Sequence, residues 1–238
     1  MGNSYDELRV LRENIEKVKY NIAVAAKKSG RAPEEITLVA ATKTVSSDKI
    51  NLALENGITE IGENRVQELL SKFDDINKDK AKIHFIGHLQ KNKVKDIVGK
   101  VSLIHSVDSF ELAEKISALS EQKNLVTNIL LQVNIGSDVH KFGVDEGAVE
   151  EQILKIGKLS AVKLCGLMTI LPLCENRQKA FRYFDKMRNL FVDMQRKNMD
   201  NTSMELLSMG MSSDYITAIE CGANVVRIGS ALFGERHL

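Results

Sequence analysis

The most constraining feature of the sequence is an alternation of short, β-rich apolar runs with segments of helical period, repeated about eight times. The apolar runs occupy residues 36–43, 60–63, 82–87, 103–107, 128–135, 163–170, 205–209 and 224–228. The helical segments between them occupy residues 48–56, 66–73, 91–98, 109–123, 148–159, 175–197 and 213–221. This order predicts parallel strands joined by helical crossovers. We expect an α/β fold, a single closed (β/α)8 TIM-type barrel; an open doubly wound sheet is the alternative.

An extra helix is predicted ahead of the first strand, over residues 4–29. Its apolar residues recur at steps of three and four and draw one stripe: Leu8, Leu11, Ile15, Val18, Ile22 and Ala25. Gly30 can supply the left-handed cap, and Pro33 stops the helix from continuing. No linker rich in proline or serine interrupts the series, so residues 1–238 are predicted to form one domain.

Charge and cysteine usage exclude several classes of protein. The 33 Lys and Arg residues nearly balance 32 Asp and Glu residues, for a net charge of +1, which gives no support to nucleic-acid or membrane binding by bulk electrostatics. The three cysteines include no CxxC pair, which is typical of a reducing compartment. No apolar run approaches the roughly 20 residues that cross a bilayer. We expect a cytoplasmic protein.

Polar residues gather where the predicted strands end. In strand order they are Lys43, Asn64, His88, Asp108, Asn134, Thr169, Ser208 and Arg227. The βα loops of a barrel meet at the carboxyl ends of its strands, so this is where a working site is expected.

Lys43 stands at the end of the first apolar run, ITLVAATK. Side chains alternate across a strand, so Lys43 shares a face with Val39 and Ala41 and enters the barrel if they do. Desolvation or nearby positive charge would make its amine a nucleophile. The alternative is a lysine that leaves the strand and extends into water.

Arg227 lies in NVVRIGSALFG, a run that otherwise carries no charge. A buried arginine needs an acceptor, supplied either by a ligand or by a carboxylate in a structural ion pair. Gly229 and Ser230 follow it, and Ser208 and Ser212 follow the preceding strand. Loops after the seventh and eighth strands of such barrels often hold a phosphate. The serines could instead be ordinary helix N-caps.

Other polar residues have ordinary structural explanations. Asn64 and Gln67 can form a capping box for the next helix. The basic residues Lys91–Lys95 usually form a solvated face, and anion binding is the alternative. His84 and His88 lie about 13 Å apart in an extended chain, too far to share a metal ion, so no metal site is predicted.

Six segments, taken together, resemble the pyridoxal phosphate homeostasis protein family. They are VAATK, IGENRVQE, HFIGHLQKNK, GLMTI, LSMGMSSD and VRIGSALFG, in order over nearly the whole chain. The resemblance implies the barrel that also forms the N-terminal domain of alanine racemases. It implies that Lys43 holds pyridoxal 5′-phosphate (PLP) as a Schiff base, with Arg227 facing the pyridine nitrogen.

The resemblance also implies the remaining cofactor contacts. The phosphate is expected among Ser208, Ser212, Gly229 and Ser230, and the ring is expected between Asn64 and Met209. In the fifth-strand segment the family usually has Lys-Ser-Gly where this chain has Lys141, Phe142 and Gly143, which leaves a second, weaker PLP contact at Lys141 in doubt. After Lys43, relatives often have another lysine and a proline where this chain has Thr44, Val45 and Ser46.

We therefore predict a monomeric protein that stores or delivers PLP, with apo PLP enzymes as recipients, and without strong catalytic turnover. An arginine beside the pyridine nitrogen does not favour its protonation, so carbanion chemistry is weakly supported. Racemases that resemble this fold use a Tyr from a separate C-terminal domain as a second acid/base group. We do not expect such a Tyr in this protein. The main alternative is a PLP-dependent amino-acid racemase. A third is a barrel enzyme for phosphorylated sugars, which should need an inward carboxylate.

Overall fold

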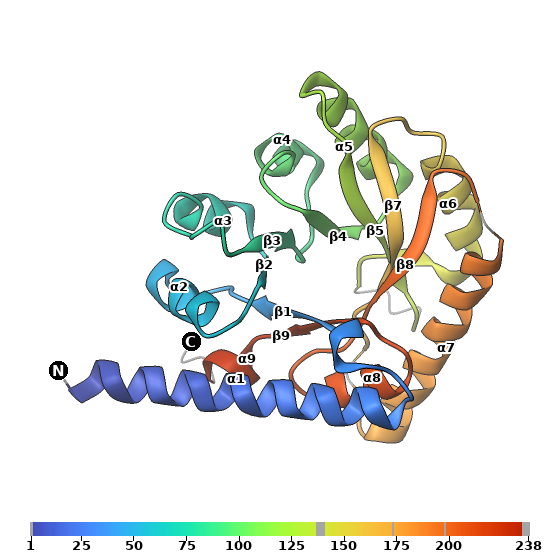
Figure 1. The fold of residues 1–238 in the computed structure, drawn as a ribbon. Coiled ribbons are helices and arrows are strands. Elements are labelled where there is room, and N and C mark those ends of the chain that lie inside the picture. The colour runs from blue at the N-terminus through green and yellow to red at the C-terminus, as the bar shows by residue number, and fades with distance from the viewer. Residues whose placement is uncertain (1, 137–140, 173, 198, 235–238) are drawn as a thin grey trace.

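The computed structural model describes residues 2–136, 141–172, 174–197 and 199–234 (Figure 1). Within these residues eight parallel strands close into a barrel, because the sheet order β4-β3-β2-β1-β9-β8-β7-β5 is completed by the pairing of β4 with β5. The strands are β1 (Thr37–Ala41), β2 (Glu60–Glu63), β3 (Lys82–Phe85), β4 (Leu103–Val107), β5 (Thr127–Asn134), β7 (Val162–Met168), β8 (Thr202–Ser208) and β9 (Val225–Ile228). The predicted TIM-type barrel is confirmed, and the open sheet is wrong.

Helices surround the barrel and cover the outer faces of the strands (Figure 1). They are α2 (Ser47–Glu55), α3 (Val66–Lys72), α4 (Val94–Ile97), α5 (Phe110–Gln122), α6 (Val149–Ile156), α7 (Arg177–Arg196), α8 (Tyr215–Glu220) and α9 (Ser230–Phe233). Three short 3-10 turns are η1 (Pro33–Glu35), η2 (Lys91–Lys93) and η3 (Glu146–Ala148). The larger apolar core lies between the strands and these helices.

The extra N-terminal helix is α1 (Gly2–Lys28), which runs across α8 and α9 (Figure 1). The predicted apolar stripe is buried at Leu11, Ile15, Val18 and Ile22, which confirms the amphipathic pattern. Gly30 adopts φ +73°, the left-handed conformation that ends a helix. In the described part of the chain, no helix combines the length and apolarity that a bilayer crossing needs.

The barrel interior holds a small apolar cluster and a set of polar side chains. Leu103, Leu130, Cys165 and Met168 form the apolar cluster. Other interior positions, on β2, β3, β4, β8 and β9, carry polar residues, and side chains alternate across each strand. These polar residues are Glu60, His84, His105, Ser208 and Arg227.

Three details differ from the sequence prediction. The first strand ends at Ala41 rather than Lys43, so Lys43 lies in the turn that follows. β6 (Val144–Asp145), which pairs with the end of β5, was not predicted, because two residues give no periodicity to read. α9 was also missed, because a helix of four residues makes barely one turn.

Candidate functional site

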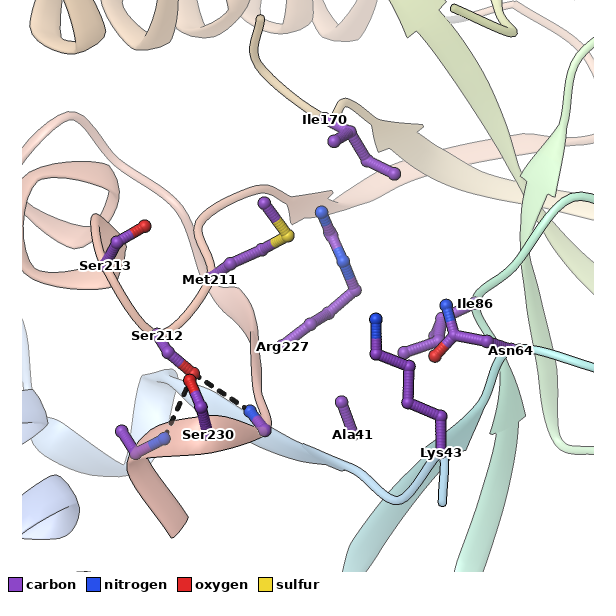
Figure 2. Close-up of a pocket in the computed structure, with 12 residues that line it drawn as sticks. Ala41, Lys43, Asn64, Ile86, Ile170, Met211, Ser212, Ser213, Arg227 and Ser230 are labelled. Carbon is purple, nitrogen blue, oxygen red and sulfur yellow. Dashed lines mark hydrogen bonds between the residues drawn. The ribbon is translucent and has the colours of Figure 1, made fainter. Parts of the chain in front are cut away.

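A cavity of about 760 Å³ opens at the carboxyl ends of the barrel strands. Six of the eight predicted site residues line it, and Figure 2 shows the side chains of five of them, Lys43, Asn64, Ser212, Arg227 and Ser230, around one space. These six are Lys43, Asn64, Ser212, Arg227, Gly229 and Ser230. Ser208 and Met209 do not line it. The carboxyl ends of the barrel strands therefore bring together residues that are up to 187 positions apart in the sequence, from Lys43 to Ser230.

Lys43 reaches into this cavity from the turn after β1. Figure 2 shows its side chain extended between Asn64 and Arg227, above Ala41. The next residue, Thr44, has φ +64°, a left-handed conformation that is unusual for a β-branched side chain. Such backbone strain costs on the order of 1–3 kcal/mol and persists only where surrounding contacts enforce it. The contacts that enforce it here come from α3.

The contacts that hold this turn centre on Lys72 at the end of α3. Its amine donates to Glu68 at 2.7 Å, to Glu63 at 3.2 Å and to the carbonyl of Thr42 at 3.1 Å. The amide of Thr44 donates to Glu68, so the turn is tied to the same group of charges. We call Lys72, Glu63, Glu68 and Thr42 the Lys72 cluster. It fixes the backbone on both sides of Lys43.

Burial governs the two carboxylates of the Lys72 cluster differently. Burial raises the pKa of Glu63, although Thr42 and Lys72 oppose this shift. At Glu68 burial also opposes ionisation, but the hydrogen bonds from Lys72 and the Thr44 amide outweigh it and lower the pKa. The cluster thus sits outside the barrel wall as a compensated set of charges, and it leaves the cavity side of Lys43 to other groups.

Asn64 follows β2 and faces Lys43 (Figure 2). The expected capping box with Gln67 is wrong, because α3 begins at Val66 with Arg65 as its N-cap and no side-chain cap. The Asn64 Oδ1 atom is buried and has no hydrogen-bond partner in the described structure. Gly87 allows this packing, since a Cβ there would lie 2.1 Å from the carbonyl oxygen of Asn64. Because Asn64 also lines the cavity, this acceptor is placed to take a hydrogen bond from a ligand there.

Arg227 is a buried cation on the cavity wall, 4% exposed. Its Nη1 atom donates to Ser208 Oγ at 2.5 Å and its Nη2 atom donates to the carbonyl of Thr169 at 2.9 Å. Neither acceptor carries a charge, and among the described residues no carboxylate forms a salt bridge with it. The structural ion pair, one of the two alternatives for Arg227, is therefore absent among the described residues. Burial lowers the pKa of Arg227 to about 10, and Asp214 offsets this only in part.

The far wall of the cavity presents backbone amides from the start of α9. The amides of Gly229 and Ala231 both donate to Ser212 Oγ, at 3.1 and 3.3 Å (Figure 2). Ser212 is not the N-cap of its own helix, because α8 starts at Tyr215 with Asp214 before it. Converging amides and hydroxyls of this kind suit an anion with several acceptor oxygens.

Ser208 and Met209 take other places than predicted. Ser208 is fully buried beneath the cavity, where its hydroxyl contacts Arg227 and His105. Met209 is fully buried in the outer core. The methionine of this loop that lines the cavity is Met211, because the chain turns at Gly210, which has φ +95°. Direct ligand contact is thus not supported for Ser208 or Met209.

Sequence reasoning missed several apolar lining residues. They are Ala41, Ile86, Ile170, Met211 and Ala231. Ala41 and Ile86 were accessible in principle, because they continue the inward alternation of Val39 and His84. Met211 and Ala231 were not, because they lie in loops where no period applies.

Other predicted strand-end groups interact with one another outside this cavity. His88 Nδ1 lies 3.2 Å from Asp108 Oδ2, and its ring stacks on Phe142 with centroids 3.6 Å apart. The Lys141 amine donates to the carbonyl of Leu171 and lines a neighbouring cavity of about 740 Å³. Lys91 and Lys95 are exposed, as expected for a solvated face.

The residues around the main cavity fit pyridoxal 5′-phosphate. An amine, a buried acceptor at Asn64, a guanidinium without a salt bridge among the described residues and the hydroxyls beside the start of α9 match an aldehyde, a ring and a phosphate. None of the described lining residues is Asp or Glu, so the inward carboxylate that a sugar-phosphate enzyme would use is not among them. Fold and site together define a TIM-type barrel that binds a phosphorylated carbonyl compound.

Comparison with known proteins identifies the family. Residues 14–237 match the family described as alanine racemase, N-terminal domain, and the chain belongs to it. It is 42% identical over 224 residues to the pyridoxal phosphate homeostasis protein of Aquifex aeolicus, covering 94% of this chain and 97% of that one. A second relative of this name, from Escherichia coli K12, is 33% identical, covering 95% and 97%. The family expected from the sequence is therefore confirmed.

A solved structure of a related protein is also similar to this chain in fold. PipY of Synechococcus elongatus, with PLP bound, has a TM-score of 0.82 and 28% identity to this chain, covering 94% of this chain and 100% of that one.

Proposed function

We propose that this protein binds PLP in the main cavity through a Schiff base on Lys43 and serves intracellular PLP homeostasis. The observation that carries the proposal is the convergence of the Lys43 amine, the uncompensated Arg227 guanidinium and the amides of Gly229 and Ala231 on one space. The names of relatives such as the Aquifex aeolicus protein support it.

Lys43 supplies the bond that retains the cofactor. Its amine adds to the aldehyde carbon and one water leaves, and the reverse reaction with water or another amine releases the aldehyde. A bond of this kind suits storage and delivery, because it holds a reactive aldehyde and still allows exchange. The Lys72 cluster contributes by fixing the turn on which Lys43 stands.

The remaining lining residues hold the ring and the phosphate. Ser212 and Ser230 take the phosphate, and the amides of Gly229 and Ala231 hold Ser212 Oγ in place beside it. Asn64 lies along the ring, and Met211 takes the place first expected for Met209. Ser208 contributes indirectly, through its hydrogen bond with Arg227.

Arg227 limits what the bound cofactor can do. A guanidinium is a donor only, so it hydrogen-bonds an unprotonated pyridine nitrogen and does not give it a proton. An unprotonated ring is a poor electron sink, and turnover at an amino-acid Cα is therefore weak. Conversion of L-alanine to D-alanine should fall well below about 1 per second, the lower end of ordinary enzymic rates.

The setting of this function is the cytoplasm, with apo PLP enzymes as recipients of the cofactor and the protein acting as a monomer. All three cysteines are free thiols, which fits a reducing compartment. Transfer is tested by mixing the loaded protein with an apo PLP enzyme and following the recipient's activity.

The cofactor bond is tested with Lys43→Ala. The variant should lose the imine absorbance and all borohydride trapping of PLP, while far-UV circular dichroism stays unchanged. Lys91→Ala, an exposed lysine of η2, is the matched control and should trap PLP like the wild type. Trapping that persists in Lys43→Ala would refute the assignment.

A further inference from the structure

A chain of hydrogen bonds crosses the barrel interior and ends at Arg227. Glu60 Oε2 lies 3.1 Å from His84 Nε2, and His84 Nδ1 lies 2.9 Å from His105 Nε2. His105 Nδ1 lies 2.9 Å from Ser208 Oγ, which accepts from Arg227 Nη1 at 2.5 Å. The chain therefore runs from the amino end of β2 to the wall of the cavity, over five strands. We call these five residues the interior relay.

The interior relay occupies space that apolar side chains usually fill in such a barrel. Its three central members, His84, His105 and Ser208, are 4%, 0% and 0% exposed. Buried polar groups cost free energy unless each one is hydrogen-bonded, and here every link has a partner. A fully satisfied buried network fixes one arrangement of its side chains.

The two ends of the interior relay fix the direction of every hydrogen bond. Arg227 can only donate, and the ionised carboxylate of Glu60 can only accept. With neutral imidazoles, one assignment alone gives each link one donor and one acceptor. Ser208 donates to His105 Nδ1, His105 Nε2 donates to His84 Nδ1, and His84 Nε2 donates to Glu60.

Burial and the neighbouring groups favour one charge state for His105 and one for Glu60. Burial, followed by the nearby His84 and Arg227, holds the pKa of His105 well below its usual range, so its ring is neutral. Burial opposes the charge of Glu60, but His84 and Lys82 outweigh it and lower its pKa, so the carboxylate is ionised.

We propose that His105 is a positioning residue for the cofactor: by accepting from Ser208 it orients the hydroxyl that holds Arg227, and so aims the guanidinium at the ring nitrogen of bound PLP. Ser208 then always offers its lone pairs to Arg227, because its own proton is taken by His105 Nδ1. The part concerning PLP rests on the proposed function, whereas the direction of the relay does not.

The direction is tested first on the protein without PLP. Long-range proton–nitrogen NMR correlations of the imidazole rings report which nitrogen carries the proton. We expect His105 to be neutral and to carry its proton at Nε2. A His105 ring protonated at Nδ1 would overturn the proposal, because Ser208 could not then donate to it.

The effect on the cofactor is tested with two substitutions of the same residue. His105→Leu removes the acceptor for Ser208, and His105→Asn keeps one, because the amide oxygen can take the place of Nδ1. Both lose the link to His84 in the same way. We expect His105→Leu to weaken PLP binding about tenfold and to change the pH titration of the bound cofactor's absorbance, and His105→Asn to stay within about threefold of the wild type.

Ser208→Ala provides a second, smaller deletion in case His105→Leu does not fold. It should reproduce the shifted titration. Ser106→Ala is the matched control, because Ser106 is a buried serine of β4 whose hydroxyl has no partner in the described structure. It should leave binding and spectrum unchanged.

The outcomes separate this inference from the proposed function. If Lys43 traps PLP but His105→Leu, His105→Asn and Ser208→Ala all give the wild-type titration, the positioning role is refuted and the proposed function stands. If the wild type does not trap PLP at Lys43, the proposed function fails, and the tautomers of the unloaded protein still decide the direction of the relay.

Discussion

Two cations lie on opposite sides of the barrel wall near Lys43, Lys72 partly buried and Arg227 buried, and their surroundings differ. The side chain of Lys72 is 13% exposed and contacts two carboxylates, Glu63 and Glu68. Its charge is compensated within the Lys72 cluster. Compensated charges of this kind shape the backbone and leave little field for a ligand.

Arg227 is buried more deeply and is held only by neutral oxygens, from Ser208 and Thr169. Its positive charge therefore remains available to whatever enters the cavity. The difference between Lys72 and Arg227 teaches that burial alone does not mark a binding residue. The nature of the acceptors does, because a cation without a counter-charge is maintained at a cost that a bound ligand can offset.

The largest effect on stability is expected from Lys72→Met. Removing the cation leaves the buried Glu63 and the partly buried Glu68 side by side without a counter-charge, which costs about 3 kcal/mol in the free energy of unfolding. Urea denaturation of the unloaded protein measures it. A loss below about 1 kcal/mol would mean that the Lys72 cluster behaves like a surface ion pair, and the contrast with Arg227 would fail.

Ser212→Ala tests whether residues of the cavity contribute to PLP binding more than to stability. Loss of one charge-assisted hydrogen bond should weaken PLP binding by about 1.5–3 kcal/mol, without a matching loss of stability. Ser71→Ala, at an exposed serine of α3 that does not line the cavity, is the control and should alter binding by less than about 0.5 kcal/mol. Equal effects of the two substitutions in a PLP titration would argue that the phosphate lies elsewhere.

The pH dependence of the free energy of unfolding tests whether His105, near Arg227, is neutral in the folded protein. The pKa of His105 is ordinary in the unfolded chain and well below 6.5 in the folded one, so the unfolded state takes up the proton first as pH falls. The free energy of unfolding should therefore drop below about pH 6.5, by at most about 1.4 kcal/mol per pH unit. His105→Asn should flatten this dependence between pH 7 and 5, as measured by urea denaturation. An identical slope in both proteins would contradict it.

The smallest change in stability is expected from Arg227→Met. Relief of the desolvated charge should offset the two lost hydrogen bonds, so the free energy of unfolding changes by less than about 1 kcal/mol. PLP binding should nevertheless weaken. A destabilisation as large as that of Lys72→Met would show that Arg227 is structural.

Much of the site was predictable because a barrel converts order along the chain into position in space. Lys43, Asn64 and Arg227 were found from the ends of apolar runs alone, since parallel strands bring their carboxyl ends to one rim. The turn at Gly210 was not predictable in the same way. It moves Met211 rather than Met209 to the cavity, and the positive φ responsible leaves no period in the sequence.

The interior relay escaped sequence reasoning for a different reason. His105 lies within an apolar strand, Leu103–Val107, and its partners His84 and Ser208 lie on two other strands. Nothing in the local sequence distinguishes a histidine with such partners from a histidine packed in a core. Only the closure of the barrel brings the three side chains together.

The central claim is that one amine, that of Lys43, faces the uncompensated guanidinium across a cofactor cavity. Peptide mapping by mass spectrometry after PLP loading and borohydride reduction tests it most directly. The account predicts a phosphopyridoxyl group on the peptide that contains Lys43, at near-stoichiometric yield. Labelling spread over surface lysines, or concentrated on another residue such as Lys141, would contradict it.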